Sequence, residues 1–197
     1  MSNPVEIEVK LRPHDLGEVL SAMRAAGYVE IESRSFEANV LYDNDREELR
    51  EKREALRVRE YRGKSILTYK GAPVPGVHKQ REELETTVGS GALFATILGR
   101  LGFHPKFRYE KFRSVFRRQE EPGVITVDET PLGPFLELEG EAEWIDRTAL
   151  ELGFDPKDYI TASYATIYVD HCLQMGVEPT HFVFDAAPGE SPSQITS

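Results

Sequence analysis

Apolar and polar residues alternate without interruption near the start of the chain. Over residues 5–11, Val, Ile, Val and Leu fall on one face, and Glu6, Glu8 and Lys10 fall on the other. Because successive side chains of a β-strand point to opposite faces, this pattern predicts a strand with one apolar and one charged face. Comparable segments, separated by turn residues such as Arg62-Gly63, predict eight strands over residues 4–11, 31–43, 55–62, 64–71, 78–88, 107–119, 122–128 and 134–142.

Apolar residues spaced three and four positions apart predict helices between and after these strands. The expected ranges are about 13–26, 91–101, 143–152 and 156–175, with a short charged helix over about 45–53. The last helix should begin with Asp155 as its N-cap and Pro156 in its first turn. We assign residues 1–176 to one folded domain and residues 177–197 to an extension, of which about 186–197 reads as a disordered tail.

Most of the predicted strands carry their charged or polar residues on a single face. The amphipathic helices need an apolar surface to cover, so the charged faces must meet one another. We therefore predict an α+β fold, a closed eight-stranded antiparallel β-barrel with a charged lumen and an apolar exterior flanked by α-helices. The sets that share a face are Glu6, Glu8 and Lys10; Arg57 and Arg59; Thr68 and Lys70; Arg81, Glu83 and Glu85; Lys111 and Arg113; Thr126 and Asp128; and Glu137 and Glu139.

Two other architectures share part of this pattern. An open antiparallel sheet with its charged face in water is a common arrangement, but it does not explain why basic and acidic pairs segregate by strand. An outer-membrane barrel is also apolar outside and polar inside, but we see no export signal, and several amphipathic helices do not suit it.

Composition narrows the range of partners. The chain has 197 residues, is 40% hydrophobic and carries a formal net charge of −10. This acidic balance disfavours nucleic acid and anionic membranes, which bind a basic face, but it permits a local basic pocket. The single cysteine, Cys172, excludes an internal disulfide, so we expect a structural thiol and a cytoplasmic protein without signal peptide or membrane span. The sequence leaves monomer and homodimer open.

The charged sets also match a known family in their order and register. Glu6-x-Glu8-x-Lys10 resembles the opening motif of the CYTH superfamily, the triphosphate tunnel metalloenzymes, which includes class IV adenylyl cyclases, thiamine triphosphatases and inorganic tripolyphosphatases. The resemblance covers about residues 5–170 and continues through Arg57-Val-Arg59, Leu67-Thr-Tyr-Lys70-Gly71, Arg81-Glu-Glu83-Leu-Glu85, Lys111-Phe-Arg113, Val127-Asp128 and Glu137-Leu-Glu139.

The resemblance implies a triphosphate held between a basic wall and an acidic wall. A buried triphosphate, with about four negative charges, needs compensating cations. Those implied to bind it are Lys10, Arg57, Arg59, Lys70, Arg81, Lys111 and Arg113. The carboxylates implied to hold Mg²⁺ or Mn²⁺ through hard oxygen ligands are Glu6, Glu8, Glu83, Asp128, Glu137 and Glu139. The residues closest to the chemistry would be Glu6, Glu8, Lys10, Asp128 and Glu137.

The branch of the family decides the reaction that the resemblance implies. Three stretches look most like the class IV adenylyl cyclases, which convert ATP to cyclic AMP and pyrophosphate: Leu101-Gly-Phe-His-Pro105, Tyr109-Glu-Lys111-Phe-Arg113 and Ser163-Tyr164. Glu137-x-Glu139 fits the triphosphatase branches equally, which would hydrolyse inorganic tripolyphosphate, thiamine triphosphate or nucleoside triphosphates. A non-catalytic sensor of nucleotides or polyphosphate is a third alternative, and the full set of carboxylates counts against it.

Four further residues carry separate expectations. Tyr164 should pack within its helix, and Lys79 should lie at the mouth of the tunnel. Glu85 is as compatible with a solvated strand end as with the lumen. Arg108 has the opposite strand parity to Lys111 and should face outward.

Overall fold

A computed structural model describes residues 5–185 of the chain. Its eight strands form one closed barrel in the order β1-β5-β4-β3-β2-β6-β7-β8, and every neighbouring pair is antiparallel. The predicted fold class is therefore confirmed. The strands are β1 Val5–Leu11, β2 Val29–Asp43, β3 Ala55–Tyr61, β4 Lys64–Lys70, β5 Lys79–Val88, β6 His104–Arg117, β7 Val124–Thr130 and β8 Gly133–Glu139.

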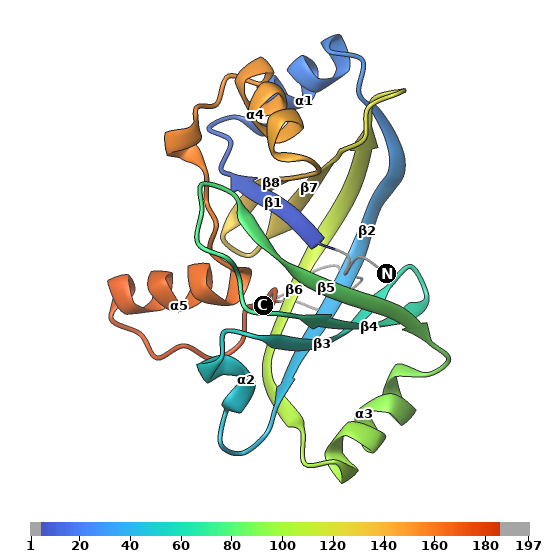
Figure 1. The fold of residues 1–197 in the computed structure, drawn as a ribbon. Helices are drawn as coiled ribbons and strands as arrows, with labels where there is room; N and C mark the ends of the chain where they lie inside the picture. The colour runs from blue at the N-terminus through green and yellow to red at the C-terminus, as the bar shows by residue number, and fades with distance from the viewer. Residues whose placement is uncertain (1–4, 186–197) are drawn as a thin grey trace, which may run out of the picture.

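Two long strands and one short strand explain how the barrel closes. β2 and β6 pair along most of their length and cross the whole molecule, joining the strands at its two ends (Figure 1). β1 pairs with β5 through residues 5–8 and with β8 through residues 8–11. A strand of seven residues thus bridges the two groups and closes the barrel.

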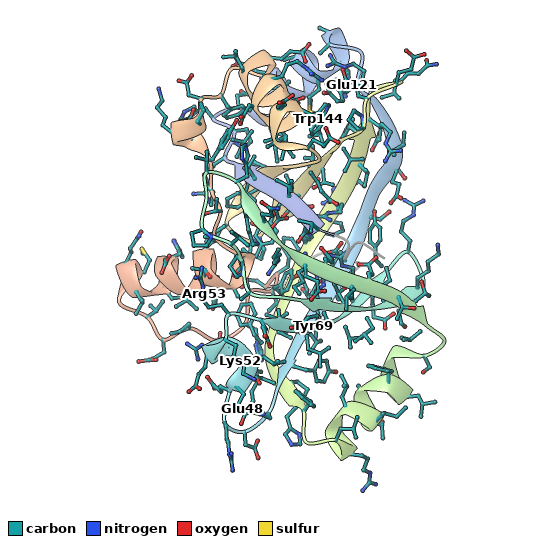
Figure 2. All side chains as sticks on the ribbon, viewed as in Figure 1. Glu48, Lys52, Arg53, Tyr69, Glu121 and Trp144 are labelled. Atoms are coloured by element: carbon teal, nitrogen blue, oxygen red, sulfur yellow. The ribbon has the colours of Figure 1, made fainter. Side chains whose placement is uncertain are left out.

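Helices cover the apolar outer surface of the barrel. α1 and α4 pack side by side over β1, β7 and β8, whereas α3 lies at the opposite end against β3 (Figure 1). Trp144 of α4 is buried between the helix and the barrel (Figure 2), and a Cβ at Gly123 would lie against its ring. The helices are α1 Leu16–Ala25, α2 Glu48–Glu51, α3 Gly91–Arg100, α4 Ala142–Glu151 and α5 Tyr164–Met175, with a 3₁₀ turn at Pro156–Asp158.

The predicted start of the last helix is wrong. Asp155 and Asp158 form a capping box that closes only a single 3₁₀ turn. Ile160 then pairs its backbone with that of Lys10, with N–O distances of 3.0 and 2.9 Å, which holds the chain extended. The helix begins after Ser163, whose side chain accepts a hydrogen bond from the backbone N–H of Thr166. A tertiary backbone pairing therefore overrides the favourable sequence signals at Asp155 and Pro156.

Beyond α5 the chain returns to the barrel. Gly176 ends the helix in the left-handed conformation, with φ of 68°. Phe182 then forms a parallel bridge with Tyr109 of β6 and is 1% exposed. The segment up to residue 185 therefore packs on the barrel, and the predicted tail of residues 186–197 lies outside the described residues. Within residues 5–185, no helix combines the length and the apolar composition needed to cross a membrane.

Candidate functional site

The barrel encloses a cavity of about 380 Å³ lined almost entirely by charged side chains. Six residues predicted to converge on one cavity all line it: Glu6, Arg57, Lys70, Arg81, Lys111 and Glu137. The remaining lining residues are Val5, Glu8, Lys10, Arg59, Lys79, Glu83, Glu85, Tyr109, Arg113, Glu139, Ser163 and Tyr164. The charged faces inferred from strand alternation therefore do form a common lumen.

Strand register decides which charges face each other. On β1, Glu6 lies opposite Arg81, Lys10 lies opposite Glu137, and Glu8 lies between Lys79 of β5 and Glu139 of β8. Side chains that are directly opposite on one face of antiparallel strands are close neighbours. The Glu8–Glu139 pairing therefore brings two carboxylates together, whereas the other three pairings join opposite charges.

The carboxylates of β1 are partly neutralised by lysines. Lys70 Nζ lies 2.8 Å from Glu6 Oε1 and also 2.8 Å from Glu83 Oε2. Glu8 Oε1 receives two lysines, with Lys79 Nζ at 2.6 Å and Lys10 Nζ at 3.2 Å. Burial disfavours the charged form of Glu8, but attraction to these lysines outweighs it and holds the pKa of Glu8 well below its usual range.

Two carboxylates of the lumen have raised pKa values. Glu139 is exposed as a residue, but partial desolvation of its carboxyl group and repulsion from Glu6, Glu137 and Glu8 raise its pKa above the usual range. Burial and the neighbouring Glu8 likewise raise the pKa of Glu6. Repulsion between neighbouring carboxylates contributes to both shifts, and a bound cation would relieve this repulsion.

The donor chemistry of this acidic side fits a hard divalent cation. Within residues 5–185 no three Asp, Glu, His or Cys side chains already converge on a single point. Mg²⁺ nevertheless commonly binds through one or two carboxylates, with phosphate oxygens and water completing its coordination. Glu6, Glu8 and Glu139 supply such oxygen donors next to the basic side of the lumen.

The basic side is built around Arg57. Its guanidinium is 6% exposed and donates to Tyr109 Oη at 3.3 Å and to Thr68 Oγ1 at 3.1 Å. Its Nε has no hydrogen-bond partner among the described residues. A buried N–H without an acceptor is unfavourable, so an anionic oxygen bound at this position would satisfy it.

Asp128 occupies a different place from the other predicted metal ligands. It is fully buried and does not line the cavity within the described structure. Lys111 Nζ lies 2.7 Å from Asp128 Oδ2, Arg113 makes a bidentate pair at 2.7 and 2.6 Å, and Tyr164 Oη donates to Oδ2 at 2.8 Å. These contacts orient two basic lining residues, and the metal-binding role of Asp128 stays a prediction.

The structure adds two buried residues that contact the lining side chains and that the sequence analysis did not single out. Glu37 on β2 is fully buried, with Lys111 Nζ at 3.4 Å and Arg59 Nε at 3.5 Å. Burial opposes its ionisation, but attraction to Lys111, Arg59 and Arg113 keeps its pKa well below its usual range. Asn39 donates to Glu37 at 2.9 Å. The available signal was the alternation of Glu37 and Asn39 with apolar neighbours along β2.

Lys79 and Tyr164 both line the lumen, which the sequence analysis did not predict. The prediction that Arg108 faces outward is confirmed. Lys79 lines the cavity, and burial followed by repulsion from Lys10 lowers its pKa to about 8. Tyr164 packs in an apolar cluster, as predicted, and also lines the lumen. Glu85 lines the lumen, and Arg108 is exposed and pairs with Glu110 on the outside of β6.

A second, larger cavity of about 870 Å³ adjoins the lumen. The residues that line both spaces are Arg57, Lys70, Lys79, Arg81, Tyr109, Ser163 and Tyr164. The outer cavity lies between α2, α5 and the first half of β6, and Arg53 is seen between the two helices in Figure 2. Its further lining includes the apolar residues Leu41, Leu49, Leu56, Pro73, Phe107 and Val169 and the cations Arg50, Arg53 and Lys106.

Comparison with known proteins agrees with this architecture. The family model of the CYTH domain matches residues 4–164 of this chain. A protein of Methanocaldococcus jannaschii, described as a candidate adenylate cyclase, is 30% identical over 135 residues, which cover 68% of this chain and 76% of that protein. The matched region includes every strand of the barrel.

Solved structures share the fold at lower sequence identity. A candidate adenylate cyclase of Vibrio parahaemolyticus matches with a TM-score of 0.72 at 20% identity, covering 83% of this chain and 97% of that chain. A protein of Pyrococcus horikoshii gives 0.72 at 24% identity, with coverage of 84% and 99%. A candidate adenylyl cyclase of Hippeastrum, reported to have a dominant triphosphatase activity, gives 0.59 at 17% identity, with coverage of 89% and 97%.

Proposed function

This chain belongs to the CYTH domain family, and on that premise we propose that it is a divalent-metal-dependent enzyme acting on the triphosphate of a nucleotide, converting ATP to cyclic AMP and pyrophosphate. The observation that carries the proposal is the barrel lumen, in which eight basic side chains oppose a group of crowded carboxylates. Apolar groups cannot replace the water around these charges, whereas a polyanion bound together with a cation can pair with both kinds of charge.

The basic residues would bind and orient the phosphates. Arg57 presents a planar guanidinium group whose Nε, without a partner among the described residues, can donate to a phosphate oxygen, and Arg113 adds positive charge while its Nε and Nη2 stay paired with Asp128. Lys10 and Lys111 add point charges from adjoining parts of the wall. Because Asp128 holds both Lys111 and Arg113, these two cations are fixed before the substrate enters.

The acidic residues would complete the site. Glu6, Glu8 and Glu139 supply the oxygen donors for Mg²⁺ or Mn²⁺, which when bound neutralises developing charge on the phosphates. Lys70 and Lys79 would exchange their present carboxylate partners for phosphate oxygens as the substrate binds. The outer cavity, with Leu41 and Phe107 in its wall, offers the nucleoside a partly apolar space outside the charged lumen.

The protein's part in the reaction is chiefly placement. Cyclisation requires the ribose 3′-oxygen to approach the α-phosphorus in line with the departing pyrophosphate. Arginine and lysine contacts to the β- and γ-phosphates fix the leaving group, and the outer cavity limits rotation of the nucleoside. Restricting both ends of the substrate favours the in-line geometry.

A triphosphatase is the second candidate, because the lumen alone can hold a triphosphate without any organic group. The Hippeastrum structure, reported with a dominant triphosphatase activity, supports this alternative at the level of the shared fold. In that reaction water would attack the terminal phosphorus, and the same basic residues would bind the remaining phosphates. We also propose a cytoplasmic protein, monomeric or homodimeric, without nucleic-acid or membrane partners, in keeping with the buried Cys172 and the net charge of −10.

One experiment separates these functions. Purified protein is incubated with ATP, thiamine triphosphate or inorganic tripolyphosphate, each with Mg²⁺ or Mn²⁺, and cyclic AMP, pyrophosphate and orthophosphate are resolved. Cyclic AMP with equal pyrophosphate supports the cyclase, and orthophosphate from any of the three supports the triphosphatase. Activity should be abolished by EDTA and survive a zinc-specific chelator. Tight binding without turnover of any substrate would indicate a sensor, and turnover in metal-free protein would refute the metal assignment.

A further inference from the structure

Part of one edge of β6 is not paired with its neighbour β7. β7 pairs with β6 only from Phe112 to Phe116, so the earlier residues of β6 lack that neighbour. The segment after α5 fills this edge. Phe182 N donates to Arg108 O at 2.9 Å, and Glu110 N donates to Phe182 O at 2.9 Å. The added segment lies beyond residues 4–164, the part matched by the family model.

Phe182 anchors this segment beneath two tyrosines of the site. Its ring is 1% exposed, stacks on Tyr168 with ring centroids 5.2 Å apart, and belongs to the apolar cluster of Tyr109, Phe135 and Tyr164. Tyr109 and Tyr164 lie with their ring centroids 6.2 Å apart. The aromatic side chain therefore closes the wall behind these two rings.

The same tyrosines place polar groups of the lumen. Tyr109 Oη accepts a hydrogen bond from Arg57 at 3.3 Å, and Tyr164 Oη donates to Asp128 at 2.8 Å. A ring that is packed tightly on its apolar side keeps its hydroxyl in one position. Loss of that packing would therefore be felt at Arg57 and Asp128, although neither residue belongs to the cluster around Phe182.

We propose that the C-terminal segment acts as a ninth strand of the barrel and that Phe182 is a positioning residue, which fixes Arg57 and Asp128 for triphosphate binding through the hydroxyls of Tyr109 and Tyr164. The inference rests on the proposed function of the lumen. It assigns a role to residues outside the matched family region. Phe184 of the same segment packs on Phe112 instead, with ring centroids 5.4 Å apart, and provides a matched control.

The test is a double-mutant cycle on binding of a non-hydrolysable ATP analogue, measured by calorimetry in EDTA. Phe182→Ala should weaken binding about tenfold, as loss of a supporting group commonly does. Phe184→Ala should change it less than about twofold. In a background of Tyr109→Phe with Tyr164→Phe, where the hydroxyls are absent, Phe182→Ala should cause little further loss, because coupled residues are not additive.

Each result bears on the inference. Wild-type affinity in Phe182→Ala, an equal loss in both backgrounds, or an equal loss in Phe184→Ala would overturn it. If Phe182→Ala does not unfold cooperatively, Phe182→Leu replaces it in the same cycle, with a smaller loss in the same direction expected and the same results overturning the proposal. A wild-type protein that binds no triphosphate, with or without Mg²⁺, would instead refute the proposed function and this inference with it.

Discussion

Replacing Glu8 with Gln tests the division of the lumen into two walls most directly. The substitution keeps the shape of the side chain and removes one negative charge. Glu8 Oε1 lies 2.6 Å from Lys79 Nζ and 3.2 Å from Lys10 Nζ, so both lysines lose this carboxylate as a partner. Lys10 retains Glu137 at 3.2 Å, whereas Glu8 is the carboxylate that pairs with Lys79 in the described structure.

The size of each effect follows from these contacts. Removing one partner of a buried ion pair costs about 3–5 kcal/mol. Because only Lys79 is left without a carboxylate, we expect a loss of about 3 kcal/mol in the free energy of unfolding, at the lower end of that range. In a metal-free lumen a phosphate oxygen can then pair with the released lysine. A charge-assisted hydrogen bond of about 1.5–3 kcal/mol corresponds to binding of the triphosphate that is tighter by about tenfold or more.

Three measurements check this reasoning. Urea unfolding reports stability, calorimetric titration of a non-hydrolysable ATP analogue in EDTA reports metal-free binding, and turnover with saturating Mn²⁺ reports catalysis. Turnover should fall at least about a hundredfold, because a ligand of the metal should matter no less than its outer-shell partners. Glu30→Gln, at an exposed position of β2, is the control and should leave all three unchanged. If Glu8→Gln instead lost metal-free binding, the lumen charges would form a structural ion-pair network, and the two-wall model would be wrong.

Four further predictions address the phosphate wall, the pH dependence of binding and of stability, and the packing. Arg57→Ala should weaken metal-free triphosphate binding about 10- to 100-fold, as measured by calorimetry. Arg108→Ala, on the outer face of β6, should leave this affinity unchanged, and equal losses in the two variants would contradict the assignment of Arg57 to the phosphate-binding wall. Because the pKa of Lys79 is lowered to about 8, its charge is lost as pH rises through that value, so metal-free affinity should fall there in the wild type but not in Lys79→Met. Between about pH 8 and 10.5 the Lys79 amine binds a proton more readily in the unfolded chain than in the folded one, because folding lowers its pKa from 10.5 to about 8. The free energy of unfolding of the wild type, relative to that of Lys79→Met, should therefore rise with pH over this range. A difference in urea unfolding that does not change with pH would refute this prediction. Gly123→Ala should lower the free energy of unfolding in urea by about 1–3 kcal/mol, because its Cβ would clash with the indole ring of Trp144. Gly99→Ala, in open space on α3, should leave the protein as stable or make it more stable. The reverse order of stability would contradict this description of the packing.

Strand alternation alone predicted most of the lumen. Side chains at positions i and i+2 of a strand must share a face, so Arg57 and Arg59, or Lys111 and Arg113, can be assigned to the same side without any tertiary information. The demand of the amphipathic helices for an apolar surface then indicated which side faced inward. Both steps depend on local geometry, and for that reason the barrel and its charged interior could be predicted from the sequence.

Other features depend on contacts between distant parts of the chain, which no local pattern encodes. The pairing of Ile160 with Lys10 shortens the last helix against its own capping signals. The register of β1 decides that Glu8 faces Glu139 on one side and Lys79 on the other. The unpaired edge of β6 becomes visible only once β7 is seen to end its pairing at Phe112, and it gives Phe182 a partner. The sequence by itself determined which faces are charged, because side-chain direction is a local property, whereas the fold decided which charges meet, because that requires strand register and closure of the barrel.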